Sequence, residues 1–162
     1  MKKKLSVTAL CVLVSVSVFI LCGCGGSKLD KAVSFNGKIT FSIPQDWQQT
    51  DAARSSLTNL DQYSSADGNS LVTVSTVNYL SPEQYYIETG NSMYKNINYK
   101  EIESGKSSSN VEYQIYSFSG DERYGTKHIE HDDIFVSSGT GMYSIVVLGD
   151  EVSASDIAKT LK

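Results

Sequence analysis

Both histidines of this chain lie in one short run, His128-Ile129-Glu130-His131-Asp132-Asp133, together with three carboxylates. Alternate side chains of a β-strand share a face, so His128, Glu130 and Asp132 would project together. A histidine and two carboxylates suit a divalent cation. The alternative is a solvated strand face of mixed charge, which we favour because no second histidine shares the face. We therefore predict no metal site and name these three residues as the candidate ligands should a cation bind.

The other residues do not indicate covalent catalysis. Serines are abundant, but there is no G-x-S-x-G elbow, and neither histidine is near a glycine-framed serine in the sequence. A glycine-rich phosphate loop is also missing from the sequence. The cysteines are Cys11, Cys22 and Cys24, so the chain after residue 24 offers no thiol nucleophile, disulfide or cysteine-based metal site. We predict that the protein is not an enzyme and uses no cofactor.

Cys24 has a predicted role as a lipid attachment site. Three lysines at positions 2–4 precede an uncharged segment, 5–21, which is the layout of a secretory signal peptide. That segment ends in Leu21-Cys22-Gly23-Cys24. This ending resembles the bacterial lipobox, which has an aliphatic residue, two small residues and then a cysteine. The resemblance implies cleavage before Cys24, a thioether-linked diacylglycerol on its sulfur, and usually acylation of the new amino group, for example with palmitate.

The alternative for segment 5–21 is an uncleaved transmembrane helix, because its length lies at the short edge of what spans a bilayer. That alternative leaves the Gly-Cys-Gly-Gly junction unexplained, so we favour lipidation. Two or three acyl chains anchor a protein stably, whereas one chain does so only marginally. The lysines stay cytoplasmic and the rest crosses. We therefore predict a protein on the extracytoplasmic face of the cell membrane, with membrane lipid as a partner through acylated Cys24.

Composition limits the number of domains and the classes of partner. The predicted divisions are a signal peptide (1–23), an anchor and tether (24–32) and one domain (33–162). Removing residues 1–23 from the 162 leaves 139, enough for one domain with a core. The 14 basic residues lose three lysines, so 11 face 18 acidic ones, a net charge of minus seven. Such a surface repels nucleic acid and anionic headgroups, so we predict neither as a partner.

A β-hairpin is predicted over residues 33–43, around Asn36-Gly37. A two-residue turn would pair Phe35 with Lys38 and place the apolar residues of the two strands on opposite faces. A three-residue loop with glycine in the left-handed region pairs Phe35 with Ile39 and places all of them on one face. We predict the longer loop.

The second hairpin strand leads into Phe41-Ser42-Ile43-Pro44-x-x-Trp47. This stretch, near the start of a domain of this length, resembles the opening of the PsbP-like family. The family is named after the extrinsic PsbP subunit of photosystem II and includes many bacterial lipoproteins. The rest of the similarity, over about residues 33–162, is in the order of elements. The resemblance implies an antiparallel sheet with helices on both sides, no shared catalytic motif, and a protein partner, because named members attach to larger complexes. The first strand follows the anchor closely, without a long extension, which argues against a photosynthetic role.

Capping residues predict two helices. Ser81 suits the N-cap, Pro82 the first helical position, and Gln84 would complete a capping box. This helix should extend to residue 97 and pack one face against the sheet. That face comprises Tyr86, Gly90, Met93, Tyr94 and Ile97, and Gly90 should allow the helix to approach the sheet closely. Ser153 or Ser155 should cap a short helix to Leu161. That helix should bury Ile157, Ala158 and Leu161.

The remaining segments predict strands near 57–63, 71–80, 99–103, 111–118, 124–136 and 142–148. The last is the most continuously apolar and belongs in the middle of the sheet. Together these elements predict an α+β fold: an antiparallel β-sheet of about six strands, flanked by one central and one C-terminal α-helix, as a PsbP-like α/β/α sandwich.

Two functions follow from these features. The first is a noncatalytic binding or assembly module for another envelope protein. The second is a receptor for a small ligand or a divalent cation, which would use the acidic run and an aromatic surface. Five tyrosines are candidates for that surface, although we favour ordinary half-buried positions for them; they are Tyr85, Tyr86, Tyr113, Tyr116 and Tyr124.

Overall fold

The computed structural model describes residues 28–50 and 60–162. The strands are β1 (Leu29–Phe35), β2 (Ile39–Pro44), β3 (Gln48–Gln49), β4 (Leu60–Ser64), β5 (Leu71–Val77), β6 (Tyr94–Lys106), β7 (Glu112–Glu122), β8 (His128–Ser137) and β9 (Met142–Leu148). The helical segments are α1 (Pro82–Tyr85), the π-helix η1 (Tyr86–Gly90), α2 (Asn91–Met93) and α3 (Ala154–Lys159).

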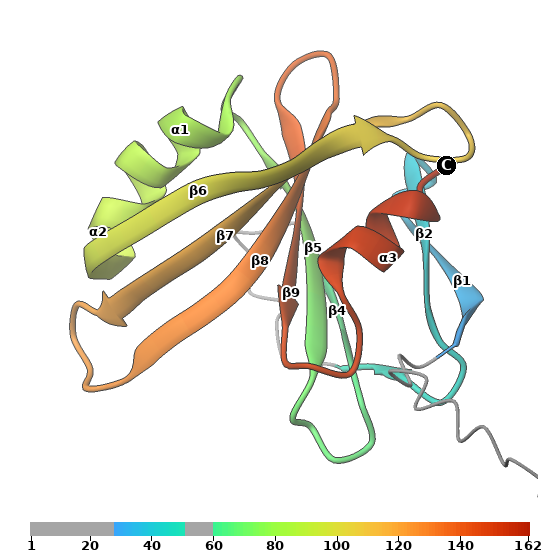
Figure 1. Cartoon of the computed structure of the whole chain (residues 1–162), viewed down its shortest axis with the longest axis horizontal. Helices are drawn as coiled ribbons and strands as arrows, with labels where there is room; N and C mark the ends of the chain where they lie inside the picture. The colour runs from blue at the N-terminus through green and yellow to red at the C-terminus, as the bar shows by residue number, and fades with distance from the viewer. Residues whose placement is uncertain (1–27, 51–59) are drawn as a thin grey trace, which may run out of the picture.

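The described strands form one antiparallel seven-stranded sheet and a separate two-stranded hairpin (Figure 1). The order in the sheet is β3-β4-β5-β9-β8-β7-β6, and the hairpin is β1-β2. The antiparallel α+β prediction is confirmed in this form, with seven strands instead of about six. β9 lies at the centre of the sheet, as its continuous apolar sequence predicts.

The hairpin has the predicted three-residue loop. Phe35 pairs with Ile39, and both Asn36 and Gly37 have positive φ, at 54° and 64°. This register places the apolar side chains of both strands on the face that joins the core. β1 begins at Leu29, within the segment predicted as a tether, so the folded part starts closer to residue 24 than expected.

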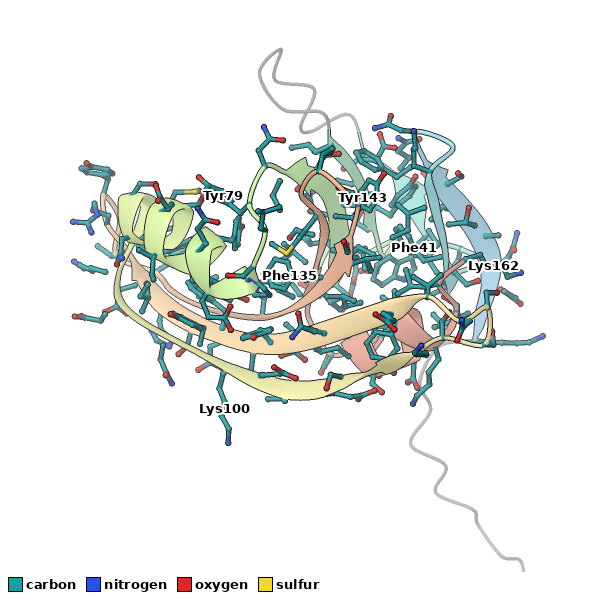
Figure 2. All side chains as sticks on the ribbon, turned by 90° about the horizontal axis from the view of Figure 1, so that it is seen from above. Phe41, Tyr79, Lys100, Phe135, Tyr143 and Lys162 are labelled. Atoms are coloured by element: carbon teal, nitrogen blue, oxygen red, sulfur yellow. The ribbon has the colours of Figure 1, made fainter. Side chains whose placement is uncertain are left out.

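Two hydrophobic cores lie on opposite faces of the same sheet. The hairpin and α3 cover one face, and the first core is there, with Phe41, Trp47, Ile134, Ile145 and Ile157 among its members. The segment from α1 to α2 covers the other face towards the opposite end of β6, β7 and β8 (Figures 1 and 2). The second core is there, with Tyr86, Tyr116, Phe118, Phe135 and Met142.

β7 shows how one strand serves both cores. Tyr113 and Ile115 point to the first core, whereas Tyr116 and Phe118, on the opposite face, point to the second. Both faces of this strand therefore carry buried residues. The two helical covers are offset along the strand, so each face is buried over a different half of its length.

The first helix starts as predicted and ends earlier. Ser81 is the N-cap, because its Oγ accepts a hydrogen bond from the Gln84 amide at 3.2 Å. The Gln84 side chain accepts instead from the Leu80 amide, at 3.5 Å, so it does not complete the predicted capping box. The helical segment ends at Met93, and Tyr94 starts β6.

The predicted helix to residue 97 is wrong because pairing with β7 overrides the helical spacing. Tyr94 has extended backbone angles and pairs with Glu122. Tyr94 and Ile97 still pack on the second core, but from a strand, whereas Met93 points outward and is 55% exposed. Gly90 is buried, but a Cβ there would lie 3.5 Å from Ile97 Cδ1, an ordinary contact, so the predicted close approach does not require glycine.

The C-terminal helix follows its prediction. Ser153 caps α3, with its Oγ accepting from the Asp156 amide at 3.1 Å. Ile157, Ala158 and Leu161 are fully buried. The described part of the chain contains no helix long and apolar enough to cross a membrane.

Candidate functional site

The predicted lipidation residue, Cys24, lies outside the described residues, as do the predicted signal peptide and residues 25–27 of the tether. The other predicted site residues all lie on β8, which begins at His128 rather than at the expected residue 124.

His128 binds two carboxylates across the end of the sheet. Its Nδ1 lies 2.7 Å from Asp121 Oδ1 on β7, and its Nε2 lies 3.4 Å from Glu130 Oε1. The hydrogen bond to Asp121 is the main reason that the pKa of His128 is raised. A protonated imidazole is a donor at both nitrogens and has no lone pair for a metal. Both ring nitrogens of His128 therefore face carboxylates, and protonation of the ring would strengthen both contacts.

The three candidate metal ligands share a face but do not form a ligand set. Within residues 28–50 and 60–162, no group of three or more His, Cys, Asp or Glu side chains is placed to hold a metal ion. His128 and Glu130 are exposed, which agrees with the favoured solvated face. The opposite face differs, because Asp133 is 0% exposed and His131 is largely buried.

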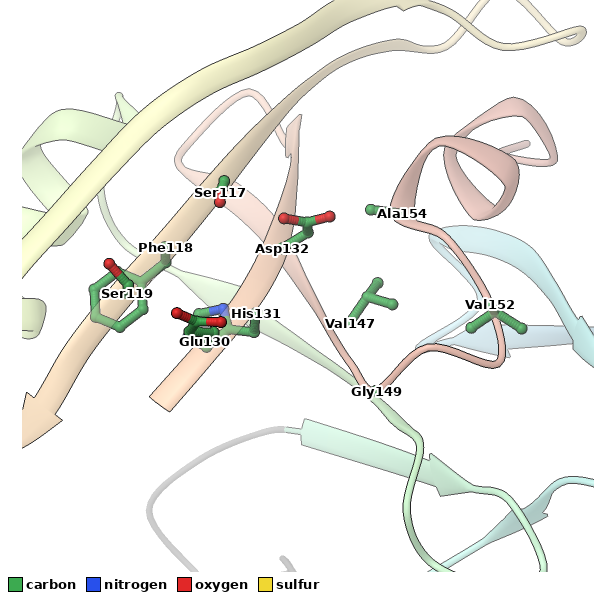
Figure 3. Close-up of a pocket in the computed structure, with 10 residues that line it drawn as sticks. All are labelled: Ser117, Phe118, Ser119, Glu130, His131, Asp132, Val147, Gly149, Val152 and Ala154. Atoms are coloured by element: carbon green, nitrogen blue, oxygen red, sulfur yellow. The ribbon is translucent and has the colours of Figure 1, made fainter. Parts of the chain in front are cut away.

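An open pocket of about 440 Å³ adjoins this face, beside the start of α3 (Figure 3). Strand register builds it: Ser117 pairs with Asp132, and Asp132 pairs with Val147, so the three side chains form a row across β7, β8 and β9. Ser119 and Glu130 form the next row. The far wall includes Val152 and Ala154.

Asp132 is the half-buried carboxylate of this pocket. Burial raises its pKa, and the neighbouring charge of Asp133 raises it further. Its side chain projects towards Ala154 at the start of α3 (Figure 3). Asp132 is one of the three candidate ligands for a cation, and the structure places it in a pocket with two serines that the sequence did not single out.

A second polar group lies inside the second core. Asp133 Oδ2 accepts a hydrogen bond from the Tyr86 hydroxyl at 2.5 Å. Asp133 Oδ1 lies 3.2 Å from His131 Nδ1, but the two atoms are not aligned for a hydrogen bond. Burial, then the charge of Asp133, raises the pKa of Tyr86 far above its ordinary value. The Tyr86–Asp133 pair was not predicted from the sequence. Asp133 and Phe135 are two residues apart on β8 and therefore share a face, so the apolar Phe135 could have indicated that Asp133 faces a core.

The Tyr86 to Asp133 bond fixes the π-helix to the sheet. Tyr86 is the first residue of η1 and stacks on Tyr99, with ring centres 4.5 Å apart. His131 stacks on Phe118 at 4.7 Å. Each of these side chains is held by packing on at least one ring, so the cluster is a rigid polar contact within an aromatic core.

The candidate tyrosines do not form one exposed surface. Tyr86, Tyr113 and Tyr116 are buried, and the Tyr116 hydroxyl donates to Glu83 at 2.7 Å. Tyr85 is partly buried, as favoured from the sequence. Tyr124 is the exception, at 93% exposed in the turn between β7 and β8.

Comparisons with known proteins identify the fold. No protein-family model matches the chain, and no curated protein matches it in sequence. The solution structure of cyanobacterial PsbP (CyanoP) from Synechocystis sp. PCC 6803 is similar with a TM-score of 0.53 and 8% identity, covering 87% of this chain and 96% of that chain. A crystal structure from Bacteroides thetaiotaomicron gives a TM-score of 0.41 and 12% identity, covering 83% of this chain and 48% of that chain. The similarity to CyanoP extends over nearly its whole length, and the chain therefore has a PsbP-like fold.

Proposed function

We propose that this protein is a lipid-anchored, noncatalytic module on the extracytoplasmic face of a bacterial membrane, where it binds or helps to assemble another envelope protein. The observation that carries the proposal is the order of the parts: a lipobox ending at Cys24, followed shortly by a PsbP-like domain whose first strand starts at Leu29. A short connection keeps the domain near the bilayer.

One exposed region has the composition of a protein-binding surface. Met93, Arg123 and Tyr124 line an open, mostly apolar depression of about 400 Å³ between α2 and the β7–β8 turn. Arginine and tyrosine are the residue types most enriched among interface hot spots, and methionine is also enriched at interfaces. The Arg123 guanidinium donates to the Asn91 and Tyr94 carbonyls, at 2.5 and 3.1 Å, so the turn that carries Tyr124 is held against α2. A partner would meet a preorganised surface.

Lipidation is tested by growing cells with radiolabelled palmitate and comparing the wild type with Cys24→Ala. The wild type should carry label and fractionate with membranes, and the variant should lose both properties. Cys22→Ala is the matched control, because it removes a neighbouring thiol that the lipobox uses only as a small residue. Equal labelling of wild type and Cys24→Ala would rule out this anchor.

Partner binding is tested by placing a photo-crosslinking phenylalanine analogue at Tyr124 in intact cells. We expect a discrete adduct with a membrane or envelope protein, and we expect it to be lost in the Cys24→Ala background. The same analogue at Gln45, which is exposed and outside the depression, is the control and should give no such adduct. Absence of an adduct at Tyr124, or an equal adduct at Gln45, would contradict the proposed surface.

A further inference from the structure

The pocket beside α3 contains polar side chains that the fold itself does not use. The side chains of Ser117, Ser119 and Asp132 make no hydrogen bond or ion pair with another described residue. None of these side-chain atoms is completely buried, so water can reach them in the free protein. A ligand with hydrogen-bond donors can replace that water beside the half-buried carboxylate.

The two walls of the pocket differ in chemistry. The strand wall presents acceptors, from the Asp132 carboxylate and the two hydroxyls, in adjacent rows of the sheet. Val147 lies beside Asp132 on the sheet, and the opposite wall includes the apolar residues Val152 and Ala154. A ligand that fits both walls has a hydrogen-bond donor of positive charge at one end and a short apolar stem.

Two other ligand classes fit less well. Sugars commonly stack on exposed aromatic rings, but the Phe118 ring at this pocket is buried in the second core. Calcium takes about six to eight oxygen ligands, and the described residues provide no cluster of carboxylates or histidines that could hold a metal. An organic cation needs fewer ligands, and it can use the apolar wall.

The charges around Asp132 favour a cation at this position. Glu130 lies on the same face of β8 as Asp132. Asp133, the next residue in the sequence after Asp132, is a buried carboxylate. His128 offsets part of the charge of Glu130 but does not contact Asp132. Lys100 on β6 pairs with Ser117 on β7, so one strand separates Lys100 from Asp132 on β8. Lys100 forms no ion pair with the Asp132 carboxylate. His131, the preceding residue on β8, counteracts these carboxylates, but its effect on the pKa of Asp132 is smaller than the effects of burial and of Asp133.

The geometry points to a binding site for a small primary amine in its ammonium form. The ammonium group donates to the Asp132 carboxylate and to the Ser117 and Ser119 hydroxyls, while the methylene groups of the ligand pack against Val147 and Val152. Three N–H donors match three acceptors, and the stem replaces water on the apolar wall. This site goes beyond the proposed anchoring and assembly function and does not depend on it.

The test is calorimetric titration of the full chain, purified in detergent, with putrescine at neutral pH and constant ionic strength. We expect saturable binding at one site. Choline should bind at least about tenfold more weakly, because its quaternary nitrogen has no N–H to donate to the carboxylate. Calcium chloride should give no saturable heat.

Substitutions locate the site. Asp132→Asn should weaken putrescine binding by about tenfold or more, and Ser117→Ala should weaken it by several-fold. Asp46→Asn removes the same charge from an exposed position outside this pocket and should leave binding unchanged. Emission of the single tryptophan, Trp47, checks that each variant is folded. The assignment is overturned if the wild type binds no putrescine, if Asp132→Asn binds it equally well, or if choline or calcium binds as tightly.

Discussion

At the scale of single residues, the most constrained polar contact is the one between Tyr86 and Asp133. The carboxylate is completely buried among aromatic rings, and one of its oxygens has the Tyr86 hydroxyl as its donor. Burying a carboxylate is costly unless donors compensate it. The core therefore depends on this bond more than on an average hydrogen bond, and the dependence can be measured.

Tyr86→Phe should destabilise the protein by about 1 to 3 kcal/mol, because it removes the donor and leaves a buried acceptor unpaired. The free energy of unfolding from urea titration gives the value. In an Asp133→Asn background the same substitution should cost less, since the group left unpaired is then neutral. An equal cost in both backgrounds would show that the hydroxyl does not serve the carboxylate.

The Asp121 to His128 pair should make stability depend on pH. The folded-state pKa of His128 is raised above 6.5. The contribution of His128 to folding stability is therefore complete below its unfolded-state pKa and is lost as pH rises through its folded-state pKa. The pKa of Asp121 is lowered, mainly by His128, so its contribution is lost as pH falls through its folded pKa. The pair therefore stabilises the fold between these two values.

NMR titration of the His128 ring should give a pKa above 6.5, and Asp121→Asn should lower it. A His128 pKa at or below 6.5 in the wild type, or one that Asp121→Asn does not change, would contradict the ion pair.

At the scale of elements, the two helical covers are held to the sheet in different ways. α3 is short and binds through fully buried apolar residues, with a serine cap at its start. The segment from α1 to α2 contains a π-helix turn, and its buried face ends in the polar contact of Tyr86. π-Helix turns are rare and frequently occur at functional sites. Here the turn directs Tyr86 to Asp133.

Ser153→Ala should destabilise the protein by about 1 kcal/mol, because the Asp156 amide at the start of α3 loses its side-chain acceptor. The midpoint of urea unfolding measures the change. Ser109→Ala is the matched control: its side chain is exposed, and the residue donates only through its backbone amide. Equal effects of the two substitutions would argue against a capping role for Ser153.

At the scale of the whole molecule, one sheet serves two cores. β7, β8 and β9 each carry residues of the first core on one face and of the second core on the other. Separation of the cores would require these shared strands to come apart. The first and second cores should therefore unfold together in one transition. Direct contact between their buried side chains is not needed, because the shared strands couple them.

Trp47 fluorescence reports on the first core, and the NMR ring signals of Tyr86 and Tyr116 report on the second. Their urea transitions should coincide. Ile157→Ala, in the first core, should cost about 2 to 5 kcal/mol and move both transitions equally. Leu80→Ala, at a position 77% exposed, is the control and should change stability by less than about 0.5 kcal/mol. A tyrosine signal that keeps its midpoint in Ile157→Ala would show two independent units.

Features that depend on neighbours in the chain could be predicted from the sequence alone. The hairpin loop follows from the alternation around Asn36-Gly37, and the helix starts at Ser81 and Ser153 follow from capping chemistry. The central position of β9 follows from its continuous apolar run, because a strand covered on both faces has no polar side. Each of these depends on a few residues in one segment.

The half of each sheet face that is covered depends on long-range packing and could not be predicted from local sequence. Residues 94–97 have helical spacing, yet pairing with β7 makes them strand. Asp132 and Asp133 are adjacent in sequence, but one lines an open pocket and the other is buried under Tyr86. The row of Ser117, Asp132 and Val147 joins three strands, so no local pattern contains it. Burial and pocket formation depend on what packs over a strand, and here that cover comes from distant parts of the chain.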